Sequence, residues 1–184
     1  MLTSQHIRYA ARIINRGGVV AYPTEGVFGL GCLPDNFDAV GRVLTIKKRD
    51  PGMGLVLIVS DIDQLAGWTD AALDGECLRS TLDKPVTWIV PATNEVPWWI
   101  RGEHAGIAVR MTAHPVARAL CREVDAPLVS TSANISGRPP ARSIFVLRRV
   151  LGSLVDYVVP GECGPARGPS EIRDVETGKV LRPA

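Results

Sequence analysis

The chain has 184 residues, of which 46% are hydrophobic and 22% charged, and its formal net charge is +2. This composition is typical of a globular protein with a substantial core, so we expect a single domain over residues 1–184. With so small a net charge, the protein does not belong to the class that binds nucleic acid through a high overall positive charge. The sequence contains no run of 18 or more apolar residues, so no membrane span is expected. The four cysteines are widely and irregularly spaced, which predicts reduced thiols in a cytoplasmic protein.

The N-terminal segment predicts an amphipathic helix that leads into a buried strand. The apolar residues of one helical face are Ile7, Ala10, Ala11 and Ile14. Gly17-Gly18 ends this pattern. The run Val19 to Tyr22 is typical of a buried strand, and Pro23 ends it because proline has no N–H to donate to a ladder.

A polar, glycine-rich loop is expected after this strand and is the first candidate site. Thr24 and Glu25 stand at the carboxyl end of the strand, where ligands of open α/β sheets bind. Glycines at positions 26, 29 and 31 would let the backbone approach a ligand closely. The alternative is a turn that only links the strand to a helix, and the local residues do not decide between the two.

Further along the chain, apolar runs and turn residues predict alternating helices and strands. We expect helices over residues 37–47, 61–68, 71–82, 114–122 and 143–151, and strands over 55–59, 86–90, 106–110, 128–131 and 157–159. A closing hairpin is predicted over 172–181, with its turn at Thr177-Gly178. The alternation predicts an α/β fold with a twisted, mixed parallel and antiparallel sheet flanked by helices.

Two further segments carry unusual polar groups. Residues 47–49 (Lys-Lys-Arg) follow a predicted helix, and taken alone they favour simple capping of the helix dipole. Residues 130–137 (STSANISG) follow a buried strand, and their hydroxyls and N–H groups favour an anion-binding nest over a locally satisfied turn. Arg110 would point into the same crevice, and Arg167 and Ser170 could close over it. These groups indicate a nucleotide ligand, whereas Walker, dinucleotide and HExxH motifs are missing from the sequence.

The runs YPTEGVFGLGC, KKR, GIAVR, STSANISGRPP and PSEIRD, in this order, closely resemble the YrdC/TsaC family of threonylcarbamoyl-AMP synthases along essentially the whole chain. The resemblance implies a YrdC-like fold with a concave basic face, in the short form without the C-terminal domain of longer relatives. It implies that a nucleotidyltransferase joins L-threonine, bicarbonate and ATP to give L-threonylcarbamoyladenylate and pyrophosphate. The product would serve threonylcarbamoyladenosine modification of tRNA next to the anticodon, through a downstream tRNA threonylcarbamoyl transferase complex.

The family's signature residues fall on Lys47, Arg49, Ser132 and Asn134, which the resemblance implies are catalytic. Threonine or its carbamate is expected on Thr24, Tyr22 and Arg110. ATP is expected on Lys48, Ser130, Thr131, Ser170 and Arg167. Mg²⁺ is expected mainly on the ATP phosphates, with no metal site built by the protein.

Three points stay open. Met53 stands where close relatives often place a lysine, so one phosphate contact is expected to be absent or supplied by Lys48. The adjacent Trp98 and Trp99 fit core packing, a pocket wall or a docking surface equally well. The alternative function is a module that binds double-stranded RNA or tRNA without catalysis; it predicts a steep salt dependence and no need for threonine.

Overall fold

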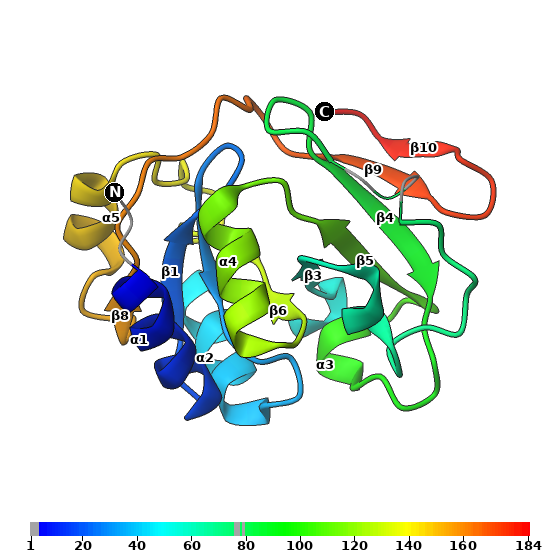
Figure 1. Ribbon diagram of the computed structural model, residues 1–184, viewed down its shortest axis with the longest axis horizontal. Coiled ribbons are helices and arrows are strands. Elements are labelled where there is room, and N and C mark those ends of the chain that lie inside the picture. The colour runs from blue at the N-terminus through cyan, green and yellow to red at the C-terminus, as the bar shows by residue number, and fades with distance from the viewer. Residues whose placement is uncertain (1–3, 76–77, 79) are drawn as a thin grey trace.

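The computed structural model describes residues 4–75, 78 and 80–184, and Figure 1 shows its helices and strands. The α-helices of the described residues are α1 (Ser4–Asn15), α2 (Phe37–Lys47), α3 (Trp98–Arg101), α4 (Pro115–Val124) and α5 (Ile144–Leu151). Single 3₁₀ turns form at Pro51–Met53 and Ile62–Leu65. The helices predicted over 37–47, 114–122 and 143–151 are confirmed.

The strands form two mixed sheets where one was predicted. The four-stranded sheet has the order β7 (Thr131–Ser132), β2 (Phe28–Gly31), β1 (Val20–Pro23) and β8 (Tyr157–Val158). The six-stranded sheet has the order β10 (Val180–Arg182), β9 (Glu171–Asp174), β4 (Val86–Pro91), β5 (Gly106–Met111), β3 (Val56–Val59) and β6 (Leu128–Val129). Strands β1 and β8, β3 and β5, and β4 and β9 pair in parallel, and the other pairs are antiparallel. The mixed α/β class is therefore confirmed.

Most of the helices lie on the four-stranded side of the molecule, whereas α3 packs against β5 of the larger sheet. Figure 1 shows α1, α2, α4 and α5 on the side of β1, while β4, β9 and β10 lie on the other side. The predicted apolar face of α1 is buried and packs with α4 around Tyr22 and Leu120. No helix of the described chain has the length and apolar character needed to cross a membrane.

Two predictions about helices are wrong. Residues 61–68 form only the 3₁₀ turn at Ile62–Leu65, where the Asp61 carboxylate and the Gln64 amide make a capping box. The chain then turns away at Gly67, whose φ of 80° is left-handed. Residues 71–75, 78 and 80–82 form no regular helix, and positions 76, 77 and 79 of that prediction lie outside the described residues.

The predictions for the glycine-rich loop and for the fifth predicted strand need correction as well. The expected glycine-rich loop is a hairpin: Thr24 to Val27 form the turn, and Phe28–Gly31 is strand β2. The strand expected over 128–131 is split, because β6 pairs with β3 in the larger sheet and β7 pairs with β2 in the smaller one. Ser130 lies at the crossing, where its N–H donates to the Val56 carbonyl at 2.8 Å. The chain thus passes from one sheet to the other within the predicted STSANISG site.

Candidate active site

A polar cavity of about 240 Å³ gathers most of the predicted site residues. Those that line it are Thr24, Arg49, Arg110, Ser130, Thr131, Ser132 and Ser170. They come from the β1–β2 turn, the segment after α2, strand β5, the crossing between the sheets and the loop before β9. The fold therefore brings together segments that lie up to about 150 positions apart in the sequence.

Arg49 brings to this cavity a guanidinium whose hydrogen-bond donors are only partly used. One Nη donates to the Gly54 carbonyl at 3.0 Å, while its buried Nε has no hydrogen-bond partner among the described residues. Burial lowers the pKa of its guanidinium, although arginine stays charged at any ordinary pH. Buried donors are normally satisfied, so Arg49 retains hydrogen-bonding capacity for a ligand.

Lys47 is placed differently from the simple expectation of a phosphate-binding cation. The residue is only 3% exposed, and its ammonium lies within hydrogen-bond distance of four acceptors: the carbonyl and Oγ of Ser132 at 2.6 and 3.4 Å, and the carbonyl and Oδ1 of Asn134 at 3.1 and 3.0 Å. The Ser132 hydroxyl also donates to Asn134 Oδ1 at 2.6 Å. Lys47 therefore anchors the hydroxyl-rich segment from behind, and of these three residues Ser132 lines the cavity.

Arg110, another arginine of the cavity lining, is paired with the carboxylate of Glu25. Its Nη1 is 3.5 Å from Glu25 Oε2, its Nε donates to Thr87 Oγ1 at 3.2 Å, and its Nη2 donates to Ser170 Oγ at 3.4 Å. Glu25 is 1% exposed. Burial alone would raise the pKa of Glu25, but the Arg110 charge and the Thr112 hydrogen bond outweigh it and hold that pKa below its ordinary value.

The β1–β2 turn forms another wall of the cavity. The Thr24 hydroxyl donates to the Val27 carbonyl at 2.7 Å, which closes the turn. A Cβ on Gly29 would stand 3.2 Å from Thr24 Cγ2 and 3.3 Å from Ser130 Oγ. Gly29 thus keeps the space between these two side chains open, as expected where a backbone borders a ligand site.

Three predicted site residues lie elsewhere. Tyr22 is fully buried behind the cavity, and its hydroxyl donates to the Val129 carbonyl at 3.2 Å. Lys48 is exposed at the end of α2, in a left-handed conformation with φ of 50°, and borders a different groove. Arg167 is exposed and falls outside the described lining. The structure therefore does not bring these three side chains to the cavity.

Two functional candidates escaped the site predicted from sequence. Glu25 was expected in the loop but received no role, although its pairing with Arg110 joins two predicted segments. Arg182, at the end of β10, lines the cavity, and its Nη2 donates to the Ser170 carbonyl at 2.8 Å. A lone arginine in a C-terminal strand has no neighbouring motif that marks it as a site residue. Its place at the cavity follows from the pairing of β10 with β9, which only the fold shows.

The polar cavity adjoins a second, more apolar one of about 410 Å³. Residues common to both are Arg49, Leu55, Val56, Ser170 and Arg182. The floor of the second cavity comes from β3, β4, β5 and β9 of the six-stranded sheet. Together they offer an apolar surface beside a hydroxyl-rich one, with Arg49 and Arg182 bordering both, which suits a ligand with a flat apolar part and an anionic part.

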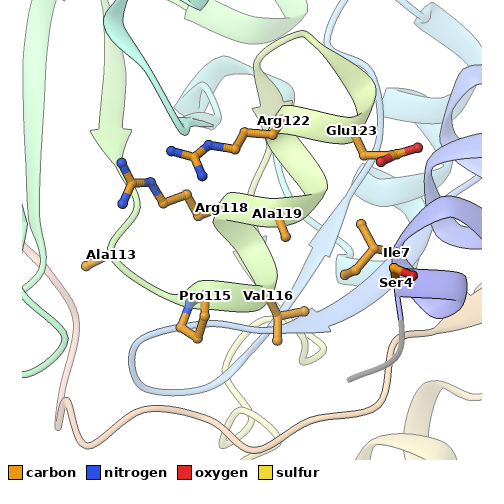
Figure 2. Close-up of a pocket in the computed structure, with 9 residues that line it drawn as sticks. All are labelled: Ser4, Ile7, Ala113, Pro115, Val116, Arg118, Ala119, Arg122 and Glu123. Atoms are coloured by element: carbon orange, nitrogen blue, oxygen red, sulfur yellow. The ribbon is translucent and has the colours of Figure 1, made fainter. Parts of the chain in front are cut away.

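A larger groove of about 640 Å³ between α1 and α4 is separate from this site (Figure 2). Its lining includes Ile7, Val116 and Ala119, and Arg118 and Arg122 point away from α1. None of the predicted site residues lines it. The polar cavity is therefore the site candidate on chemistry rather than on size, and the concave basic face stays a prediction.

The cavity gives a divalent metal little to bind directly. Among the residues that the structure describes, no group of three or more His, Cys, Asp or Glu is placed to hold an ion. Glu25 is the acidic side chain of the described lining, and both its oxygens already have partners. These residues do not fit a protein-built Mg²⁺ site.

The two adjacent tryptophans have separate environments. Trp98 is 53% exposed, whereas Trp99 Nε1 donates to the Pro34 carbonyl at 3.0 Å and its ring packs edge-on against Phe37. Neither ring is part of the described lining of the polar cavity. A wall of that cavity is therefore not their role.

Comparison with known proteins gives consistent matches over nearly the whole chain. The family model Sua5/YciO/YrdC, described as telomere recombination, matches residues 12–184. A threonylcarbamoyl-AMP synthase of Nitrosococcus oceani is 51% identical over 178 residues, covering 96% of each chain, and one of Coxiella burnetii is 46% identical over 182 residues, covering 97% of each. The crystal structure of P. abyssi Sua5 complexed with L-threonine is 29% identical with a TM-score of 0.85, covering 96% of this chain and 53% of that one. This chain thus spans about half of that Sua5.

Proposed function

The chain belongs to the Sua5/YciO/YrdC family, and we propose on that basis that it is a threonylcarbamoyl-AMP synthase. The enzyme joins L-threonine, bicarbonate and ATP into L-threonylcarbamoyladenylate and releases pyrophosphate. The product would serve tRNA modification next to the anticodon, in the cytoplasm, through a downstream transferase complex. The structural observation that carries the proposal is the polar cavity, whose lining combines Arg49, Arg110 and Arg182 with the hydroxyl side chains of residues 130–132.

The chemistry that this cavity would support is nucleotidyl transfer. The amine of threonine and bicarbonate form a carbamate with loss of water, and a carbamate oxygen attacks the α-phosphorus of ATP. The new P–O bond forms as the bond to the bridging oxygen of the leaving pyrophosphate breaks. Charge builds on the phosphate oxygens, so the reaction needs fixed cations and donors more than a strong base. Arg49, with a free buried donor, would stabilise that charge.

The substrate parts fit different sides of the cavity. Arg110, beside the β1–β2 turn, would hold the carboxylate of threonine or of its carbamate, and Thr24 in that turn would border the threonine side chain. Ser130, Thr131 and Ser132 would bind the phosphates, and the adjoining apolar cavity would accept the nucleoside. Mg²⁺ would enter on the ATP phosphates, and none of these residue roles depends on it.

The test is pyrophosphate release from ATP and bicarbonate, measured with L-threonine, with L-serine and without an amino acid. We expect release that depends strongly on threonine and weakly on serine. Release without any amino acid, or no release at all, would contradict the synthase. The alternative, RNA binding without catalysis, has no support from the names of the similar proteins, and it would be favoured if salt-sensitive RNA binding appeared without pyrophosphate release.

A further inference from the structure

Glu25 is a buried carboxylate whose two oxygens have very different partners. Oε1 accepts from the Thr112 hydroxyl at 2.6 Å, the Ala113 N–H at 2.9 Å and the His114 N–H at 3.3 Å. These three donors belong to the short segment between β5 and α4. Oε2 faces Arg110 Nη1 at 3.5 Å. One oxygen is therefore fixed by a side-chain hydroxyl and two backbone N–H groups, and the other faces the guanidinium.

Arg110 in turn is held by long contacts on its other atoms. Its bonds to Thr87 Oγ1 and Ser170 Oγ measure 3.2 and 3.4 Å, and these two hydroxyls bond each other at 2.8 Å. Among the described residues, Glu25 is the acidic group that forms an ion pair with Arg110 within 4 Å. The hydroxyls alone would let the guanidinium move toward any anion in the cavity, so the carboxylate fixes its direction.

The charge balance of the cavity also depends on this pair. A buried carboxylate without a counter-charge is costly, so Glu25 and Arg110 hold each other in place. The pair is close to neutral, whereas Arg49 and Arg182 have no acidic partner within 4 Å in the described structure. A polyphosphate is then favoured at Arg49 and Arg182, whose charges are not balanced, and a single carboxylate at Arg110.

We propose that Glu25 is a positioning residue that orients Arg110 for the carboxylate of L-threonine or its carbamate and reserves that side of the cavity for the amino acid. This inference rests on the proposed function. Glu25 acts through Arg110 and does not itself react. Its loss should therefore impair the use of threonine far more than the use of ATP.

A double-mutant cycle tests whether Glu25 acts through Arg110. Glu25→Gln keeps an acceptor for the three donors but turns an amide N–H toward the guanidinium, so the charge pair is lost. We expect this variant to raise KM for threonine by about tenfold and to leave KM for ATP within about twofold. In an Arg110→Gln background, Glu25→Gln should cause little further loss, because the residue through which it acts is already gone.

The matched control is Thr112→Val, which removes one donor to Oε1 but leaves the ion pair. It should lower the melting temperature without a selective rise in KM for threonine. Additive effects of Glu25→Gln and Arg110→Gln, or an equal rise in KM for both substrates, would overturn the role of Glu25. If Glu25→Gln does not fold, Glu25→Asp keeps the charge and withdraws it by one methylene, and an unchanged KM for threonine in that variant would overturn the proposal too.

The two proposals fail in distinguishable ways. A wild-type chain without threonine-dependent pyrophosphate release contradicts the synthase itself. A wild-type chain with such release, combined with additive variants, contradicts only the positioning role of Glu25.

Discussion

At the scale of single residues, Arg49 is the cation of the cavity lining with an unpaired buried donor that could bind a ligand. Its Nε is a buried donor without a hydrogen-bond partner in the described part of the chain, and a second nitrogen donates to the Gly54 carbonyl. We expect Arg49→Ala to lower kcat for pyrophosphate release by about two to three powers of ten, as for the loss of one preorganised donor to a developing charge. The far-ultraviolet circular dichroism and the melting temperature should change little.

Lys48→Ala is the matched control for Arg49→Ala, since Lys48 is the neighbouring cation but is exposed and lies outside the cavity lining. Its kcat should stay within about twofold of wild type. A wild-type rate in Arg49→Ala would remove Arg49 from the mechanism, and an equal loss in both variants would point to a general charge effect.

We expect Lys47 to make the reaction sensitive to alkaline pH. Burial and the nearby Arg49 charge lower the pKa of Lys47 to about 8. Below that pH the ammonium has three N–H groups that can donate hydrogen bonds to the acceptors of Ser132 and Asn134. Above it the neutral amine has only two and no charge, so its hydrogen bonding to this segment weakens. We expect kcat at saturating substrates to fall as pH rises through about 8, with the slope of a single ionisation. A profile that stays flat to pH 10 would contradict this role.

At the scale of elements, the β1–β2 turn shapes the cavity through one side-chain hydrogen bond. Thr24→Val removes the hydroxyl that donates to the Val27 carbonyl. We expect the free energy of unfolding, measured in urea, to fall by about 1 kcal/mol, the usual net value of such a bond. KM for threonine should rise more than KM for ATP, because Glu25 in this turn pairs with Arg110.

Thr24→Ser is the control for this element, because it keeps the hydroxyl and removes only the methyl group that faces Gly29. Its stability should lie between those of wild type and Thr24→Val. Equal increases in both KM values for Thr24→Val would mean that the turn is scaffold and does not select the amino acid.

The elements that the sequence predicted best are those with local end signals. Helix α2 begins after Asn36, whose side chain accepts from the Ala39 N–H, and α5 begins after Ser143, which accepts from the Val146 N–H. Strand β2 was missed because its glycines resemble a loop. They are required by packing: a Cβ on Gly31 would stand 2.7 Å from the Tyr22 ring, a contact invisible until the hairpin forms.

The candidate site was predictable where its residues share a strand end and unpredictable where a side chain's direction decides. The segment 130–132 and Arg110 reach the cavity as expected. Lys47 instead turns its ammonium into the backbone of residues 132–134, and Tyr22 turns into the core. Residue type and spacing specify neither rotamer nor burial, so these outcomes need the packed structure.

At the scale of the whole molecule, the cavity exists because the chain crosses between two sheets. The smaller sheet brings the β1–β2 turn, the larger one brings Arg110 and Arg182, and Ser130 lies at the crossing. The groove between α1 and α4 in Figure 2 is separate from this cavity, although the N–H of Ala113 in its lining donates to Glu25. Its basic side chains, Arg118 and Arg122, are not part of the described lining of the polar cavity, so we place them outside the proposed chemistry.

Charge reversal on this outer face tests whether activity resides in the cavity or in overall basic character. Arg118 and Arg122 lie one turn apart on α4, both exposed, and replacing both by glutamate changes the formal net charge from +2 to −2, since each replacement removes two units. A synthase whose cations are fixed in the cavity should keep kcat and both KM values within about twofold, at low and at physiological salt. Arg148→Glu with Arg149→Glu on α5 makes the same change in charge elsewhere on the surface. A large loss of turnover in the α4 variant alone, with its melting temperature preserved, would place part of the active machinery on this face and contradict the assignment to the cavity.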